Sequence, residues 1–308
     1  MRRQQRRGGL LGATCLALAL VAACTSGGTG DGAGAAATRQ SPTTGATATA
    51  TSGTAAGELP RPDHVMVVVF ENEDAADVVG SAEAPYLTSL STSGAAFTDA
   101  HGETHPSQPN YLALFSGSTQ GVTDDRCPQK LTGDNLASQL LATGQTFVGY
   151  SEDLPGAGYT GCSAGDYRRK HNPWVNFTGL PASVNQPFSA LPTDYAQLPT
   201  VSFVVPNMCH DMHDCDVATG DTWAKNHLDR YVTWAKDHNS LLIVTFDEDS
   251  GTADNHIATI VVGAPVRATT STQRINHYDV LRTLEDMYGL EPLGHAADAH
   301  PITGVWLP

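Results

Sequence analysis

Five short stretches rich in Val, Ile, Leu or Phe recur along the chain with little polar alternation. Continuous apolar runs of this length indicate strands that are buried on both faces. Between them lie segments with the apolar spacing of helices, so strand and helix alternate. This alternation predicts an α/β fold with a doubly wound parallel or mixed sheet. The predicted strands are 64–70, 146–150, 200–205, 241–246 and 257–262, and the predicted helices are 86–93, 111–116, 135–143, 221–237 and 278–288.

A Pro- and Gly-rich stretch, 154–199, has neither a helical nor a strand period. Segments of this length without regular structure are uncommon inside a domain and usually have a function. We expect the stretch to be an excursion from the sheet that roofs a site.

The first 57 residues differ sharply from the remainder. Arginines followed by a short apolar run predict a secretion signal over 1–23. Val21-Ala22-Ala23-Cys24 resembles a bacterial lipobox, which predicts an exported protein that is lipid-anchored through Cys24 on the outer face of the bacterial cell membrane. The alternative is ordinary cleavage with release. Residues 24–57, almost wholly Gly, Ala, Thr and Ser, form a predicted flexible tether, and 58–308 has the size of one domain.

The predicted mature chain is strongly acidic. Removing the four arginines of the signal lowers the Lys and Arg count from 17 to 13 against 32 acids, which gives a net charge of about −19. Such a surface repels nucleic acid and anionic headgroups, so we expect no nucleic-acid partner and membrane contact only through the lipid on Cys24. A phosphate-bearing substrate would need local positive charge from a metal or an imidazolium.

Four cysteines remain after the predicted signal and lipid site. An even number in an exported protein predicts two disulfides, although four cysteines allow three pairings. Proximity in sequence favours Cys127 with Cys162 and Cys209 with Cys215. The alternative, a zinc site that uses Cys209 and Cys215 with the histidines between them, is disfavoured because one short loop leaves little room for tetrahedral geometry.

Acidic and amide side chains follow two of the predicted strands directly. Glu71-Asn72 comes after the first strand, and Asp247-Glu248 comes after the fourth. Because ligands bind outside the carboxyl ends of strands in open α/β sheets, these side chains can converge on one site. Several acids at one strand end repel one another, and a hard divalent cation would relieve that repulsion. The alternative for the first pair is that Asn72 only caps a turn.

A serine and several histidines complete the candidate chemistry. Ser107 lies in a proline-flanked turn that opens a predicted helix, where helix amides can stabilise negative charge on an attacked phosphoryl group. His210 and His213 lie in one short acidic loop and can donate protons or bind metal, and His256 opens the last strand. The alternatives are an N-cap role for Ser107 and a solvated loop around the two histidines.

These motifs together resemble the phosphoesterase family that joins bacterial acid phosphatases and phospholipases C, within the alkaline phosphatase-like superfamily. The resemblance covers nearly the whole predicted domain, in the right order. It implies a three-layer α/β/α sandwich with a central, mostly parallel sheet and hydrolysis through a phosphoenzyme. The motifs are Glu71-Asn72, Thr104-His105-Pro106-Ser107, Pro109-Asn110-Tyr111, Pro206-Asn207, Cys209-His210-Asp211-Met212-His213-Asp214, Gly220-Asp221, Asp247-Glu248-Asp249, Asn255-His256-Ile257 and His277-Tyr278.

The resemblance also implies roles for individual residues. The family's nucleophile falls on Ser107, and its phosphate-contacting histidine falls on either His210 or His213, with His256 as a further candidate catalytic residue. The family's metal ligands fall on Glu71, Asn72, Ser107, Asp247 and Glu248, which would hold one divalent ion. Oxygen donors favour Mg, Ca or Mn, and the nearby histidines keep Zn and Fe in consideration.

The sequence therefore predicts a monomeric, metal-dependent phosphoric ester hydrolase that acts on small phosphate esters through a phosphoserine. The first alternative is a phosphodiesterase of phospholipase C type that uses the same residues. It is disfavoured because the residues after Asn72 differ from those of the phospholipase C relatives, whose long insertions are also missing here. A non-catalytic lipoprotein that binds a structural metal is the second. Ser107 is not in a Gly-x-Ser-x-Gly turn, which disfavours acyl ester hydrolysis.

Overall fold

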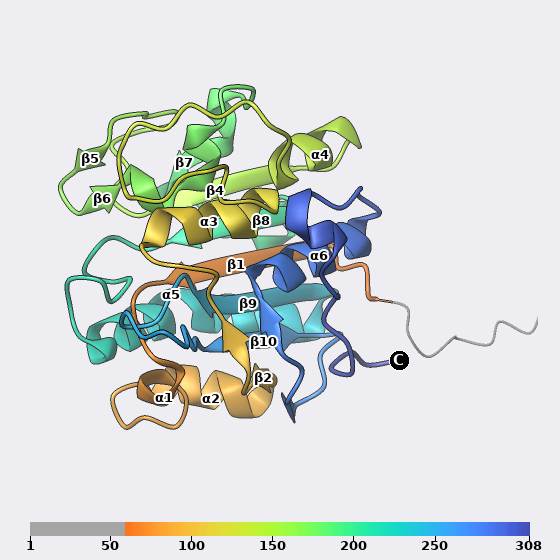
Figure 1. Cartoon of the computed structure of the whole chain (residues 1–308). Coiled ribbons are helices and arrows are strands. Elements are labelled where there is room, and N and C mark those ends of the chain that lie inside the picture. Colours follow the sequence, from red (N-terminus) through yellow and green to blue (C-terminus); the bar gives the residue numbers. More distant parts are fainter. Residues whose placement is uncertain (1–58) are drawn as a thin grey trace, which may run out of the picture. The chain divides into compact units, whose positions relative to one another are not determined.

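The computed structural model describes residues 59–308, so the predicted signal, lipidated Cys24 and tether lie outside the described part. The main sheet has eight strands in the order β11-β2-β10-β9-β1-β8-β4-β7 (Figure 1). All five predicted strands are among them. The strands of this sheet are β1 (His64–Phe70), β2 (Ala95–Phe97), β4 (Phe147–Ser151), β7 (Asn185–Pro187), β8 (Val201–Val205), β9 (Ser240–Phe246), β10 (Thr259–Gly263) and β11 (Thr269–Ser271).

The centre of the sheet is parallel. β1 pairs with β9 on one side and with β8 on the other, and β4 continues in the same direction beyond β8. β10 runs antiparallel to β9, so the sheet is mixed but mostly parallel, as the resemblance implied. Because Phe70 and Phe246 are paired at the ends of β1 and β9, the residues that follow them leave the sheet at the same rim. The loop after β8 reaches that rim as well, since Glu71 donates its backbone N–H to the Asp211 carbonyl at 2.8 Å.

Helices cover both faces of the sheet. α3 and α6 lie together in front of the strands in Figure 1, whereas α5 runs behind β9 and β10 and packs against α2. None of the helices in residues 59–308 combines the length and the apolar character that crossing a bilayer requires. The α-helices are α1 (Ala75–Val78), α2 (Pro85–Ser93), α3 (Ser107–Ser116), α4 (Leu136–Ala142), α5 (Val217–Asp237) and α6 (His277–Tyr288).

Two helices begin earlier than their apolar spacing predicts. α3 begins at Ser107 and includes Pro109, because proline is tolerated in the first turn, where its missing N–H has no partner to lose. α5 begins at Val217 because Asp216 caps it. Asp221 therefore does not start α5. Its carboxylate instead accepts hydrogen bonds from the backbone of Tyr86 and Leu87 at 3.1 and 2.8 Å, in the first turn of α2.

The excursion at 154–199 consists of short strands and 3₁₀ turns that pack onto the sheet. Trp174 lies in its buried part, and a Cβ at Gly149 of β4 would collide with the Trp174 ring, so this position accepts only glycine. The short elements in and outside the excursion are β3 (Ala100–His101), β5 (Ser163–Ala164), β6 (Tyr167–Arg168), β12 (Ile275–Asn276), η1 (Arg169–His171), η2 (Pro173–Asn176), η3 (Ala182–Val184), η4 (Phe188–Ala190), η5 (Tyr195–Gln197) and η6 (Gly294–Ala297).

Both predicted disulfides are confirmed. Cys127 pairs with Cys162, with Cα atoms 5.8 Å apart, and links the segment after α3 to the excursion. Cys209 pairs with Cys215 at a Cα distance of 4.7 Å and closes the loop after β8. The alternative in which these two cysteines bind zinc is thereby excluded. The second bridge restrains the loop after β8, which reaches the rim described above.

Glu285 should make folding stability depend on pH. This side chain of α6 is fully buried, one carboxylate oxygen has no partner, and burial raises its pKa from 4.5 to about 8. As pH rises from about 4.5 to about 8, the unfolded chain loses the proton first, so Glu285 progressively destabilises the fold. Replacing Glu285 with Gln removes this dependence. Between pH 5 and pH 8, the free energy of unfolding of the variant, measured with denaturant, should rise relative to that of the wild type by on the order of 2–4 kcal/mol. A difference that does not change with pH would contradict the assignment.

Candidate active site

Ser107 lies at the start of α3 against two carboxylates. Its Oγ is 2.9 Å from Glu71 Oε2 and 3.1 Å from Glu248 Oε1, and the residue is only 2% exposed. The single hydroxyl proton can be donated to one of these acceptors at a time. The carboxylates come from the ends of β1 and β9, so the parallel pairing of these strands brings them to the same hydroxyl.

Glu71 is fully buried, yet it is ionised. Burial alone would raise its pKa, but the charge and hydrogen bonding of His171 outweigh burial and lower the pKa to about 2. His171 Nε2 lies 3.0 Å from Glu71 Oε1, and its Nδ1 lies 3.2 Å from Asp211 Oδ2. Burial lowers the pKa of His171, whereas these two carboxylates raise it more strongly, to about 9. The ring is therefore an imidazolium between two buried acids.

Asp247 has no such cation beside it. Burial and the charge of Glu71 raise the pKa of Asp247 well above its ordinary value. Asp247 Oδ1 accepts the backbone N–H of Asn72 at 3.3 Å, whereas its Oδ2 is buried without a hydrogen-bond partner. Glu248 also has a raised pKa because of burial, although His105 Nδ1 lies 2.5 Å from its Oε2. Three buried carboxylates, one unpartnered carboxylate oxygen and a serine oxygen form a donor set that fits a hard divalent cation.

His171 was missed by the sequence analysis. It lies in η1, inside the excursion that shows no period, so no strand or helix pattern marked its position. One signal was present: Arg168, Arg169 and Lys170 precede it directly, which is the only run of three basic residues after the first seven positions of an acidic chain. The excursion thus contributes a residue to the site rather than only covering it.

The structure separates the histidines that the sequence treated together. His213 lies beside Glu71 and His171, and its ring centroid is 5.8 Å from that of His171. His210 turns away, because its Nδ1 lies 2.9 Å from Glu152 Oε2, next to the residues of α5. The His256 ring contacts the Thr98 carbonyl at 3.1 Å and stacks on His101. Among the described residues, neither His210 nor His256 has a polar contact with Ser107 or its carboxylates.

His277, which opens α6, also has a structural environment. Both of its ring nitrogens are occupied, one by the Glu103 carboxylate and the other by the Phe246 carbonyl at 2.8 Å. The ring therefore connects the start of α6 to the end of β9, one residue before Asp247. It braces the acidic end of the strand without facing the Ser107 hydroxyl.

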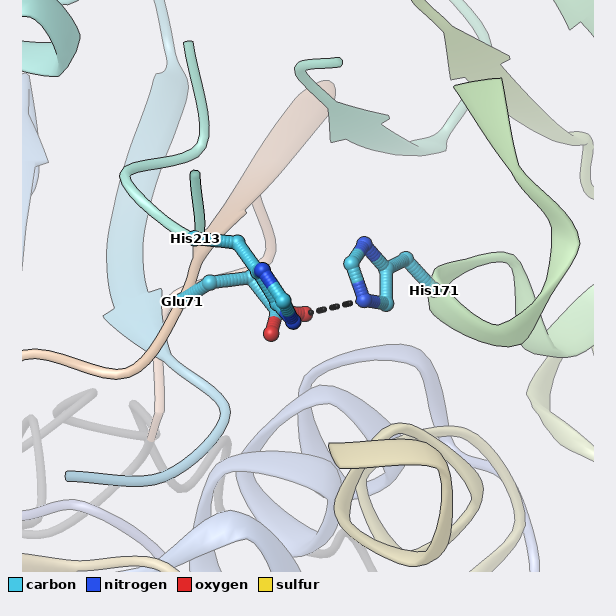
Figure 2. Close-up of side chains that lie close together, drawn as sticks. All are labelled: Glu71, His171 and His213. Carbon is cyan, nitrogen blue, oxygen red and sulfur yellow. Dashed lines mark ion pairs between the residues drawn. The ribbon is translucent and has the colours of Figure 1, made fainter. Parts of the chain in front are cut away.

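Glu71, His171 and His213 form a compact group of potential metal ligands (Figure 2). Their nearest ligand atoms all lie within 4.8 Å of one another. However, a histidine binds a metal through a neutral, unprotonated nitrogen, and both nitrogens of His171 face carboxylates. His171 is therefore better suited to balancing the charge of these carboxylates than to binding a metal.

The start of α3 offers fewer free amides than the sequence analysis expected. The backbone N–H of Gln108, next to Ser107, donates to Asp125 Oδ1 at 3.0 Å, and Pro109 has no N–H. The other oxygen of Asp125 accepts a hydrogen bond from Lys170 Nζ at 2.8 Å. The helix start therefore carries a carboxylate and an ammonium in addition to its own dipole.

The fold is similar to that of solved proteins of the alkaline phosphatase superfamily. A solved member of the alkaline phosphatase superfamily from Vibrio parahaemolyticus superimposes with a TM-score of 0.54 at 15% identity, covering 76% of this chain and 67% of that structure. A phosphonate monoester hydrolase from Silicibacter pomeroyi superimposes with the same TM-score at 11% identity, over 78% and 76% of the two chains. At these identities the likeness shows the fold alone.

The chain belongs to the Phosphoesterase family, whose profile matches residues 79–291. It is 51% identical over 259 residues to a phosphatidylinositol-3-phosphatase of Mycobacterium tuberculosis, over 82% of this chain and 86% of that protein. It is 31% identical to a phosphate-repressible acid phosphatase of Penicillium chrysogenum, over 68% of this chain and 55% of that protein. The chain thus spans little more than half the length of this fungal relative. These similarities confirm the family and the phosphoric ester hydrolase that the sequence predicted.

The two loop histidines provide a matched pair of variants. His213 lies beside Glu71, whereas His210 faces Glu152, so we expect only the first to affect turnover. Replacing His213 with Ala should lower kcat/KM for a phosphate ester by about 100-fold or more, the usual contribution of a positioned acid or base. Replacing His210 with Ala should leave kcat/KM within about threefold of the wild type. Equal losses in the two variants would contradict this distinction.

Proposed function

We propose that the protein is a metal-dependent phosphomonoesterase that works through a phosphoserine at Ser107. The observation that supports this proposal best is the position of the Ser107 hydroxyl between Glu71 and Glu248, two buried acids that follow neighbouring parallel strands. The hydroxyl lies at a helix start and at the carboxyl rim of the sheet, which is the edge where ligands of open α/β sheets bind.

The residues proposed to hold one divalent ion are those with oxygen donors on this rim. Asp247 offers an unpartnered buried oxygen, and Glu248 and the Ser107 hydroxyl lie within hydrogen-bond reach of each other. Glu71 and Asn72 complete the set at the end of β1. When bound, such an ion lowers the pKa of the serine hydroxyl and neutralises charge on the phosphoryl group. Oxygen ligands favour Mg, Ca or Mn, and Zn or Fe remain candidates because histidines are nearby.

The proposed reaction has two steps. Ser107 gives its hydroxyl proton to one of the two carboxylates that accept its hydrogen bond, Glu71 or Glu248, and its Oγ forms a bond to phosphorus. The bond between phosphorus and the substrate alcohol breaks, and His213 donates a proton to the leaving oxygen. In the second step water gives a proton to His213 as it attacks the phosphoserine, inorganic phosphate leaves, and Ser107 Oγ recovers its proton from that carboxylate. Glu71 keeps the hydroxyl oriented, and His171 holds Glu71 ionised and in place. Most of the barrier reduction comes from positioning and charge neutralisation, as is usual in phosphoryl transfer.

The names of the relatives support a monoester as substrate. The relatives described above are called phosphatases, and the one with 51% identity is a phosphatidylinositol-3-phosphatase. We therefore propose small phosphate monoesters, with phosphoinositide monophosphates as the first lipid substrates to test. The first alternative is a phosphodiesterase of phospholipase C type that uses the same residues. We further propose that the domain acts as an exported monomer, tethered to the outer face of the membrane through Cys24.

Replacing Ser107 with Ala should abolish turnover without unfolding the protein. The variant loses the attacking oxygen, and the expected loss in kcat is at least about 1,000-fold. Acid-quenched wild-type enzyme should carry one phosphoryl group on the peptide that contains Ser107, and the variant should carry none. Ser89→Ala, on α2, serves as a matched control with wild-type rates. Activity of Ser107→Ala near the wild-type level would remove Ser107 from the role of nucleophile.

Removing the divalent ion should stop hydrolysis and lower the melting temperature. The buried acids Glu71, Asp247 and Glu248 repel one another without a cation, so chelation should destabilise the wild type. Replacing Asp247 with Asn should make the melting temperature insensitive to chelator. The assay should include a monoester and a diester, each with and without chelator. Monoester turnover that survives complete metal removal contradicts metal dependence, and turnover of the diester alone favours the phospholipase C alternative.

A further inference from the structure

Lys170 lies on the side of the site formed by η1, between Asp125 and His213. Its Nζ is 2.8 Å from Asp125 Oδ2 and 3.4 Å from His213 Nε2, and its side chain is only 15% exposed. Burial lowers the pKa of Lys170, but the charges of Glu71 and Asp125 raise it more strongly, so the ammonium is charged. A half-buried cation therefore borders the site of a protein with a net charge of −15.

Asp125 connects this cation to the start of α3. One of its oxygens accepts the backbone N–H of Gln108, the residue after Ser107, and the other accepts from Lys170. The pair thus fixes the ammonium relative to the helix turn that carries the nucleophile. Without Lys170, the Asp125 carboxylate would present an uncompensated negative charge beside an incoming phosphate.

Two positions at the helix start have no free backbone amide to offer an anion. The Gln108 amide is occupied by Asp125, and Pro109 has no amide proton. The groups that contact the hydroxyl itself are the carboxylates of Glu71 and Glu248, which attract no anion. His171 is held between Glu71 and Asp211, which leaves neither of its nitrogens facing outward. Both ring nitrogens of His105 are also engaged, by the Glu248 carboxylate and the Thr252 carbonyl. Among the described residues of this site, Lys170 and His213 are the remaining cationic or protonatable groups.

From this arrangement we propose that Lys170 binds the non-bridging oxygens of the transferred phosphoryl group and that Asp125 positions it. The inference rests on the proposed function and extends it to the recognition of the phosphate. When the phosphate binds, the Lys170 ammonium keeps its hydrogen bond to Asp125 and donates a second one to the phosphate. His213, whose Nε2 lies 3.4 Å from Lys170 Nζ, is near enough to contact the same phosphate. Lys170 therefore binds the phosphate, whereas Asp125 acts only through Lys170.

The first experiment compares Lys170→Gln with Lys170→Arg and the wild type, all loaded with metal. We expect Lys170→Gln to lower kcat/KM for a soluble monoester by about 100-fold, which is typical for the loss of one charge-stabilising donor. Competitive inhibition by inorganic phosphate should weaken in parallel. Lys170→Arg keeps the charge and should retain activity within about tenfold of the wild type. Lys130→Gln, an exposed lysine in the segment before α4, removes the same charge away from the site and should change neither quantity.

The second experiment tests positioning by Asp125. Replacing Asp125 with Asn should lower kcat/KM by about tenfold in the wild-type background and by less than about twofold in the Lys170→Gln background. A purely structural role would instead lower the melting temperature in both backgrounds and leave activity losses additive. Melting curves for every variant show whether each one is folded.

The outcomes separate this inference from the proposed function. A wild type that hydrolyses no phosphate ester, or a fully active Ser107→Ala, overturns the proposed function. The role of Lys170 alone is overturned if the wild type shows Ser107-dependent activity and the folded Lys170→Gln variant stays within about threefold of it, both in kcat/KM and in inhibition by phosphate. Additive effects of the Lys170 and Asp125 replacements overturn the positioning role and leave phosphate binding by Lys170 standing.

Discussion

The site depends on burying three carboxylates close together without letting their repulsion open the sheet. Glu71, Asp247 and Glu248 lie around one serine hydroxyl, and each would be destabilising there alone. Glu71 is compensated by the His171 imidazolium, which also contacts Asp211. Asp247 has no protein cation beside its buried Oδ2, and this imbalance is the physical reason to expect a bound metal. The same carboxylates that are unfavourable to bury are the ones that we propose to act in the reaction.

The sheet topology makes this concentration of charge attainable. β9, β1 and β8 are neighbours and run in the same direction, so segments separated by more than a hundred residues end at one rim. His277 reinforces the rim by connecting Glu103 to the Phe246 carbonyl, and the Cys209–Cys215 bridge closes the loop that carries His213. The groups at the rim are thus supported from the helical layer and from the loops, which favours a fixed geometry around the hydroxyl.

Charge is distributed unevenly between the site and the rest of the protein. The chain as a whole is acidic, yet Lys170, His171 and His213 gather on the side of the rim formed by η1 and the loop after β8. Local charge of this kind acts over a few ångströms, where it outweighs a screened global field. The Asp125 carboxylate, shared by Lys170 and the Gln108 amide, shows that even the helix start is part of this balance.

The sequence by itself determined the α/β alternation, all five long strands, the two disulfide pairings and the family, because apolar runs, cysteine proximity and ordered motifs are local signals. It marked Ser107, Glu71, Asp247 and Glu248 for the same reason, since each directly follows or precedes a regular element. Only the tertiary structure separated His213 from His210 and moved His256 away from the hydroxyl, because side-chain direction in a loop depends on distant partners such as Glu152 and Thr98. It also revealed His171 and Lys170, whose segment has no period: their roles come from contacts with Glu71 and Asp125, residues that lie far away in the chain and meet them only after folding.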